Sequence, residues 1–142
     1  MRVTRRYRFS ASHRLHSPSL SEAENAELYG KCNYPYGHGH NYILEIGIRG
    51  NVDPAIGRVV SIAALDGYVS ERVVRIYDHH DMNRDIPDFV SPIPTTENMS
   101  LDVRRRLLDG WAASFPNATL DVVRIRETAR NTFELRGDTK EL

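Results

Sequence analysis

The sequence predicts an α+β fold in which an antiparallel sheet is backed by helices on one face. Two alternating segments, at 3–12 and 41–49, are followed by two helical segments, at 61–77 and from Thr95 onward, and then by strands from Leu120. A period of two is typical of a half-buried strand, and apolar residues three or four apart are typical of an amphipathic helix. Runs of strands separated by paired helices favour this fold class.

The strand predictions rest on side chains that share one face. In the first two segments these faces hold Val3, Arg5, Tyr7, Phe9 and Ala11, and then Tyr42, Leu44, Ile46 and Ile48. Residues i and i+2 of a strand point to the same side, so His13 continues the first face, and His38 and His40 are in register with the second. Two further segments, 120–127 and 132–136, are predicted as the C-terminal strands.

Capping residues and prolines set the limits of the helices. Ser21 and Glu24 form a capping box that begins a short helix, and Gly30 is suited to ending it. The segment 78–94 contains three prolines and is predicted to be irregular, and Thr95 is available as the N-cap of the next helix. The predicted apolar stripe of that helix consists of Leu101, Leu107, Leu108 and Trp111.

Composition and charge exclude a general affinity for nucleic acid. The chain has 142 residues and a net charge of zero, because 19 Lys and Arg balance 19 Asp and Glu. No basic surface follows from this balance, and the run Arg104–Arg106 is interpreted as a solvated helix face or a subunit contact. The length predicts a single domain over 1–142, in which 138–142 are expected to form a frayed tail.

The compartment is predicted from the cysteine count and from missing targeting signals. One cysteine excludes an intrachain disulfide framework and fits a reducing environment. The basic N-terminus has no apolar run behind it, as a secretory signal would require. No stretch approaches the ~18 apolar residues needed to span a bilayer. We therefore expect a cytoplasmic protein with neither a membrane nor a nucleic-acid partner.

The segment 30–42 concentrates residues that can bind a metal. It holds the only cysteine, two histidines one residue apart, three glycines and a proline. If His38 and His40 begin a strand, both imidazoles project to one face. His13, which alone would be interpreted as an ordinary core or surface histidine, is the third candidate ligand. Three neutral imidazoles suit zinc and leave one coordination position open for catalysis.

Cys32 has three possible roles in this segment. It can be a fourth zinc ligand, which would make the site closed and structural. It can be a base or nucleophile beside the metal, its thiolate favoured by nearby positive charge. It can also be a buried inert cysteine, although a glycine-rich loop is not the apolar face on which such cysteines lie.

Two further groups are candidates for proton transfer and ligand binding. In Asp78 and His79, a carboxylate can orient an imidazole for proton transfer, or the pair can simply be the polar end of a helix. Glu127 lies on the apolar face of a predicted strand, where a carboxylate needs a partner. That partner is either a guanine- or pterin-like ring with adjacent NH donors, or one of the many arginines.

Five segments together resemble the 6-pyruvoyl-tetrahydropterin synthase family. They are Phe9–Leu15, Gly30–Tyr42, Asp78–His79, Thr95–Asn98 and Glu127–Thr128. The match covers nearly the whole chain, and the two histidine motifs are its specific part. The resemblance implies a tunnelling fold, with a four-stranded antiparallel sheet, two helices, trimers that close a barrel, and a homohexamer made of two trimers.

The resemblance also implies a reaction and a role for each candidate residue. The substrate would be 7,8-dihydroneopterin triphosphate, which a lyase of tetrahydrobiopterin biosynthesis converts to 6-pyruvoyl-tetrahydropterin and triphosphate. Active sites would lie at subunit interfaces, and basic side chains that the sequence leaves unassigned would hold the triphosphate. The implied residues are the zinc ligands His13, His38 and His40, the catalytic Cys32, Asp78 and His79, and the substrate-binding Glu127, Thr95 and Thr96.

Two alternatives remain open from the sequence. The related 6-carboxy-tetrahydropterin synthases of queuosine biosynthesis use the same substrate and zinc triad but release acetaldehyde. In that branch three residues usually separate the cysteine from His-Gly-His, whereas five separate Cys32 from His38 here, which favours the pyruvoyl branch. The second alternative is a non-enzymatic pterin-binding oligomer in which Cys32 closes a structural zinc site. Tyr34 and Tyr36 replace asparagines usual in the family, and Ser61 replaces a frequent Asp or Asn.

Overall fold

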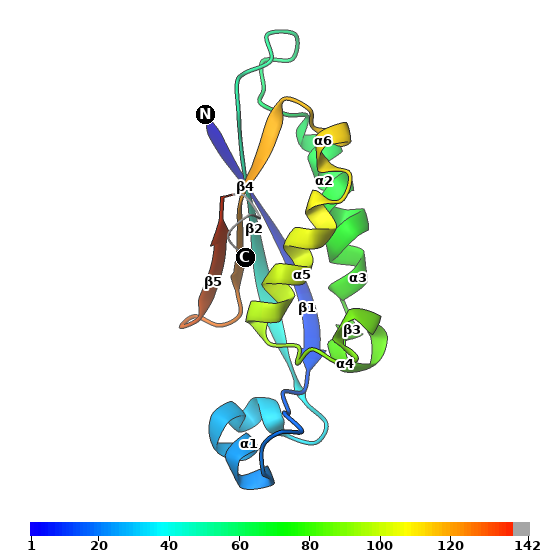
Figure 1. Cartoon of the computed structure of the whole chain (residues 1–142). Helices are drawn as coiled ribbons and strands as arrows, with labels where there is room; N and C mark the ends of the chain where they lie inside the picture. Colours follow the sequence, from blue (N-terminus) through cyan, green and yellow to red (C-terminus); the bar gives the residue numbers. More distant parts are fainter. Residues whose placement is uncertain (138–142) are drawn as a thin grey trace.

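The computed structural model describes residues 1–137 and consists of one sheet with helices packed against one face (Figure 1). The order of the strands in the sheet is β3-β1-β2-β4-β5. Their bounds are β1 (Arg2–His13), β2 (His38–Gly50), β3 (His80–Asp81), β4 (Ala118–Arg126) and β5 (Thr132–Arg136). The α+β class is confirmed, and the frayed tail predicted for 138–142 lies outside the described residues.

The expected count of four strands is wrong, because β3 adds a fifth. Its two residues pair parallel to the end of β1, with Ala11 opposite His80 and Ser12 opposite Asp81. The other pairs of neighbouring strands are antiparallel. The segment 78–94, predicted to be irregular, therefore contains a short strand, followed by a helical turn that the Asp81 side chain caps by accepting from two backbone amides.

The helices agree with the sequence in position, with some differences in detail. Their bounds are α1 (Glu22–Tyr29), α2 (Ile62–Val69), α3 (Arg75–Tyr77), α4 (Met82–Asp85), α5 (Thr96–Leu108) and α6 (Trp111–Ser114). A π-helical turn, Ser70–Val74, joins α2 to α3, and 3₁₀ turns lie at Gly30–Asn33 and Pro87–Phe89. No helix within residues 1–137 combines the length and apolar character that crossing a membrane requires.

Local capping explains where three helices begin. Both hydrogen bonds of the Ser21–Glu24 capping box are formed at the start of α1. Ser61 caps α2 by accepting from the Ala64 amide. Thr95 caps α5 in the same way, by accepting from the Asn98 amide. These bonds satisfy backbone donors that have no partner inside the first helical turn.

The core lies between the sheet and the helices that cover one of its faces. Buried apolar side chains of β1, β2 and β4 meet those of α2 and α5. In α5 the buried apolar residues are Met99, Val103 and Leu107, which are four residues apart and so share one face. Leu101, expected in this stripe, is 43% exposed instead, because it lies two residues from Met99 and Val103 and hence on the opposite side of the helix.

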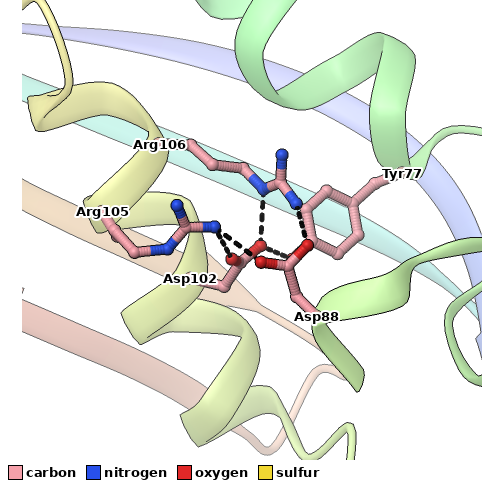
Figure 2. A network of polar contacts seen from close by, with 5 residues as sticks. All are labelled: Tyr77, Asp88, Asp102, Arg105 and Arg106. Carbon is pink, nitrogen blue, oxygen red and sulfur yellow. Dashed lines mark hydrogen bonds and ion pairs between the residues drawn. The ribbon is translucent and has the colours of Figure 1, made fainter. Parts of the chain in front are cut away.

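A network of polar side chains connects α5 to Tyr77 at the end of α3 and to the 3₁₀ turn Pro87–Phe89 (Figure 2). Asp102, which is buried, accepts hydrogen bonds from the Tyr77 hydroxyl at 2.5 Å, from Arg105 at 2.6 Å and from Arg106 at 2.7 Å. Asp88 pairs with the same two arginines at 2.8 and 2.7 Å. The network fixes Tyr77, the residue immediately before Asp78 and His79.

The expectation of a solvated helix face for Arg104–Arg106 holds only for Arg105, whose side chain is exposed. Arg104 is buried and donates to the Gly137 carbonyl, and Arg105 and Arg106 are engaged within the chain. Burial alone would raise the pKa of Asp102, but hydrogen bonds from Tyr77, Arg106 and Arg105 outweigh burial and hold that pKa below its ordinary value. The ionised carboxylate therefore stabilises the folded chain.

We expect Asp102→Asn to lower the free energy of unfolding by about 2 kcal/mol at pH 7, because it removes the charge that Arg105 and Arg106 share. The pKa of Asp102 is lower in the folded than in the unfolded chain. The stabilisation is therefore complete above the unfolded pKa and is lost as pH falls through the folded one. Urea unfolding at pH 7 and at acidic pH measures both effects.

The control for this experiment is Glu27→Gln, which removes an exposed carboxylate of α1 and should change the stability by less than about 0.5 kcal/mol. Equal stability of Asp102→Asn and the wild-type protein at pH 7 would contradict the stabilising role of the network.

Candidate metal centre

The pairing of β1 with β2 brings three histidines together. Their antiparallel register places His13 opposite His38 and Ala11 opposite His40. The ring centroids are 5.8 Å apart for His13 and His38, 5.1 Å for His13 and His40, and 4.5 Å for His38 and His40. The sequence prediction that these imidazoles share one face is confirmed.

The nitrogens of this cluster are arranged as metal ligands commonly are. His13 Nδ1 lies 2.9 Å from the Pro94 carbonyl oxygen, so Nδ1 carries the proton and Nε2 presents its lone pair. The Nε2 atoms of His13 and His40 are both buried and have no hydrogen-bond partner in the structure. A carbonyl that accepts from the other ring nitrogen and so fixes the tautomer is typical of metal-binding histidines.

Burial keeps two of the imidazoles neutral. It is the largest cause that lowers the pKa of His13, where the hydrogen bond to the Pro94 carbonyl acts in the opposite direction. Burial also lowers the pKa of His40, against the opposing charge of Glu127. A metal ion binds the neutral form of histidine, so no protons have to be displaced from these rings near neutral pH.

Cys32 completes the cluster. Candidate ligand atoms of His13, Cys32, His38 and His40 all lie within 4.8 Å of one another, and Cys32 Sγ is 2.9 Å from His38 Nε2. The loop is held in place by the Leu15 amide, which donates to the Cys32 carbonyl at 2.7 Å. It then turns at Gly37, where φ is 68° and any Cβ would collide with the backbone of His13.

The electrostatics at Cys32 differ from the sequence expectation of a thiolate favoured by positive charge. Burial raises the pKa of the thiol, and the negative charge of Glu127 raises it further. Without a metal ion the side chain is therefore protonated near neutral pH. A bound divalent cation reverses this balance, because it is the largest local charge in such a site.

Glu127 faces the cluster from just beyond the end of β4. Its carboxylate accepts a hydrogen bond from the Thr96 hydroxyl, and its charge affects the pKa of Cys32, His13 and His40. Among the described residues Glu127 forms no ion pair, so the alternative of an arginine partner is not observed. Thr95 uses its hydroxyl as a helix cap, whereas Thr96 is directed at Glu127.

Tyr42 is a candidate that the sequence analysis placed only in the apolar face of β2. Its ring is 1% exposed, stacks on Phe9 and lies edge-on to His40, with centroids 5.5 Å apart. Its hydroxyl is buried without a hydrogen-bond partner in the structure. Burial raises the pKa of Tyr42, and the charge of Glu127 adds to the rise. The signal in the sequence was its position two residues after His40.

The structure holds Asp78 and His79 apart from the cluster, at the edge of β1. Asp78 Oδ1 accepts from the Ser10 amide at 2.9 Å, and the His79 amide donates to the Ser10 carbonyl at 2.6 Å. His79 Nε2 is 3.5 Å from Asp78 Oδ1, and the His79 side chain is 79% exposed. The imidazole thus lies beside the carboxylate of its neighbour and is open to the surroundings, next to a hollow of 480 Å³ that His40 also lines.

The chain matches the family model described as "6-pyruvoyl tetrahydropterin synthase" over residues 2–138. It is 41% identical over 136 residues to 6-pyruvoyl tetrahydrobiopterin synthase of Poecilia reticulata, covering 96% of this chain and 90% of the relative. The human protein of that name is 40% identical over 136 residues, covering 96% of this chain and 91% of the relative.

Solved structures show the same similarity. The 6-pyruvoyl tetrahydropterin synthase of Caenorhabditis elegans superposes with a TM-score of 0.84 at 38% identity, covering 97% of this chain and 96% of that chain. The Plasmodium falciparum protein, with a TM-score of 0.64 and 16% identity over 96% of this chain and 97% of that one, shares the fold.

Metal binding by the histidine cluster can be measured directly. We expect the purified protein to retain about one zinc ion per chain after dialysis, as a site with three imidazole ligands does. His40→Ala should lose the metal, because two remaining imidazoles bind it far more weakly. His80→Ala, a histidine outside the cluster, is the matched control and should retain it. Full zinc occupancy in His40→Ala, measured by elemental analysis, would exclude His40 as a ligand.

Proposed function

The chain belongs to the 6-pyruvoyl tetrahydropterin synthase family, and we propose that it is a zinc-dependent lyase that converts 7,8-dihydroneopterin triphosphate to 6-pyruvoyl-tetrahydropterin and triphosphate. The observation that carries this proposal is the cluster of His13, His38, His40 and Cys32, which lies close enough to Glu127 for its charge to affect the pKa of Cys32. A base, a metal-binding triad and a ring-binding carboxylate are the groups that the reaction requires.

The donor set fits a zinc ion held by His13, His38 and His40. Two of the three rings have a buried Nε2 that lacks a hydrogen-bond partner, and a ligand there would remove that deficit. When bound, the ion would act as a Lewis acid towards the side-chain hydroxyls of the substrate and acidify the adjacent carbon–hydrogen bonds.

Cys32 is the proposed base. Its sulfur lies beside the triad and inside a loop fixed by hydrogen bonds, so it can remove a proton from the substrate side chain without a large movement. The alternative role, a fourth ligand in a closed structural site, draws on the same short distance between Cys32 and His38. Only a measurement that separates metal binding from turnover distinguishes these two roles.

Asp78 and His79 are the proposed second acid–base arm. The carboxylate orients the imidazole, and the exposed imidazole can return a proton. Because this pair lies outside the cluster of its own chain, we propose that it serves the active site of a neighbouring subunit. The free edges of the sheet, at β3 and β5, support assembly through edge strands into a barrel of trimers and then a homohexamer, which light scattering tests.

Glu127 is the proposed anchor of the pterin ring. A carboxylate accepts two parallel hydrogen bonds from adjacent ring NH and amino groups, and this geometry selects for such rings. Thr96 holds one oxygen of the carboxylate, and Thr95 keeps Thr96 in place by capping α5. With its single cysteine, the chain suits the reducing cytoplasm, which is the proposed location.

The product identifies the reaction. We expect mass spectrometry of a reaction with 7,8-dihydroneopterin triphosphate to show 6-pyruvoyl-tetrahydropterin and triphosphate, because the Cys32 loop has the spacing of the pyruvoyl branch. A 6-carboxy-tetrahydropterin product with acetaldehyde would instead place the chain in queuosine biosynthesis. Absence of turnover by zinc-loaded protein would favour the non-enzymatic pterin-binding oligomer.

The role of Cys32 is tested by Cys32→Ala. As a base, its loss should lower kcat by at least about 10²-fold, the contribution usual for proton transfer, while zinc content stays unchanged. Removal of a fourth ligand would instead release zinc, so elemental analysis of the same sample decides between the roles. Ser114→Ala, an exposed change on α6, is the control and should leave both kcat and zinc content unaltered.

A further inference from the structure

A second hollow lies behind the Cys32 loop and is not explained by the roles described so far. Its volume is 600 Å³. It is lined by residues of the β1–α1 connection, of α1 and of the 3₁₀ turn Gly30–Asn33. The side chains that give it its character are Arg14, His16, Glu22, Lys31, Asn33 and Tyr34. Three of these six are basic or imidazole groups, in a chain whose net charge is zero.

The two cations of this hollow have no acidic partner. Neither Arg14 nor Lys31 forms an ion pair with any residue in the described part of the chain, whereas Arg105 and Arg106 each contact two carboxylates. Arg14 Nε donates a hydrogen bond to the Asn33 carbonyl at 3.3 Å, and the terminal NH groups of Arg14 remain for a ligand. Uncompensated cations that face one cavity are suited to a multiply charged anion.

One neutral donor of the hollow, the His16 ring, is also oriented in advance. The Asn33 amide nitrogen donates to the Leu15 carbonyl at 2.7 Å and lies 3.1 Å from His16 Nδ1. Because that nitrogen is a donor, Nδ1 accepts and the proton of the neutral His16 ring is on Nε2. The backbone of Arg14 is fixed on both sides by Asn83, at 2.7 and 3.0 Å. Both hydrogens of the Asn33 amide are thus used within the chain, and the Nε2–H of His16 is the neutral donor that a ligand would meet, held in place by the bond to Asn33.

The hollow is connected to the metal centre through the backbone, although none of the four cluster residues lines it. Arg14 follows His13 in the chain, and Lys31 and Asn33 flank Cys32. The Leu15–Cys32 hydrogen bond joins these two segments, so the same short stretch of backbone carries metal-centre residues and the residues of the hollow. Three residues of the hollow are thus direct chain neighbours of His13 and Cys32, which would contact the reacting part of the substrate.

From these observations we infer that the hollow is a binding site for a polyphosphate group, held by Arg14, Lys31 and the His16 imidazole. The polyphosphate is either the triphosphate tail of the substrate, an assignment that rests on the proposed function, or a free polyphosphate anion. Glu22, which also lines the hollow, carries a negative charge that opposes the anion. The phosphate oxygens are acceptors only, which matches walls that offer donors.

Calorimetric titration of zinc-loaded protein with inorganic triphosphate tests the site without any turnover. Lys31→Ala should weaken binding by about tenfold, because one charge-assisted hydrogen bond is lost, and Lys31→Arg should restore most of it. Glu22→Gln should tighten binding, a change in the opposite direction that a loss of folding cannot produce. Arg58→Ala, an exposed arginine in the β2–α2 connection, is the matched control and should bind like the wild type.

Steady-state kinetics then separate the two sources of the polyphosphate. If the substrate tail occupies the site, Lys31→Ala should raise KM about tenfold with little change in kcat, and inorganic triphosphate should inhibit competitively. Noncompetitive inhibition with an unchanged KM would identify a separate anion site. If the protein binds triphosphate but shows no turnover, the proposed function is contradicted and the anion site is supported. No triphosphate binding by the wild type, or equal affinity in Lys31→Ala, Arg14→Ala and the wild type, would overturn the inference.

Discussion

The register between β1 and β2 determines both the core and the metal centre. The same pairing that stacks Phe9 on Tyr42 in the core brings His13 opposite His38 at the end of the ladder. Side chains alternate between the faces of a strand, so a slip of one residue would turn the whole set to the uncovered face. The apolar residues further along the strands therefore position the imidazoles, because a register slipped by one residue would leave those residues unburied.

The site keeps polar atoms in the interior without partners, and this has a cost. His13 Nε2, His40 Nε2 and the Tyr42 hydroxyl are buried and unpaired, at about 1–3 kcal/mol of lost solvation each. A structure selected for stability alone would hold apolar side chains at these positions. Such a deficit is offset when a ligand binds, which is why binding at this site is favoured over its empty state. Asp102, by contrast, is buried with several donors around it and contributes stability.

Sequence reasoning succeeded where a short-range rule applied and failed where the contact was distant. The strand period predicted the shared face of His13, His38 and His40, and Ser21 and Thr95 were recognisable as caps. The contact between Thr96 and Glu127 joins residues 31 positions apart on different elements, and no local pattern encodes its geometry. The same holds for β3, whose two residues pair only because they follow α3 to the edge of β1.

The Arg104–Arg106 run shows that composition alone does not predict which charged residues find partners within the fold. A run of arginines has the composition of a solvated face, and only the folded chain brings Asp88 beside it. The same network fixes Tyr77, and the Ser10 backbone holds the next two residues, so that His79 adopts a φ of 61°. A side chain other than glycine rarely keeps that conformation unless its surroundings impose it. The fold thus fixes the backbone of an imidazole that it leaves exposed, and the proposal that His79 acts on a neighbouring subunit starts from this arrangement.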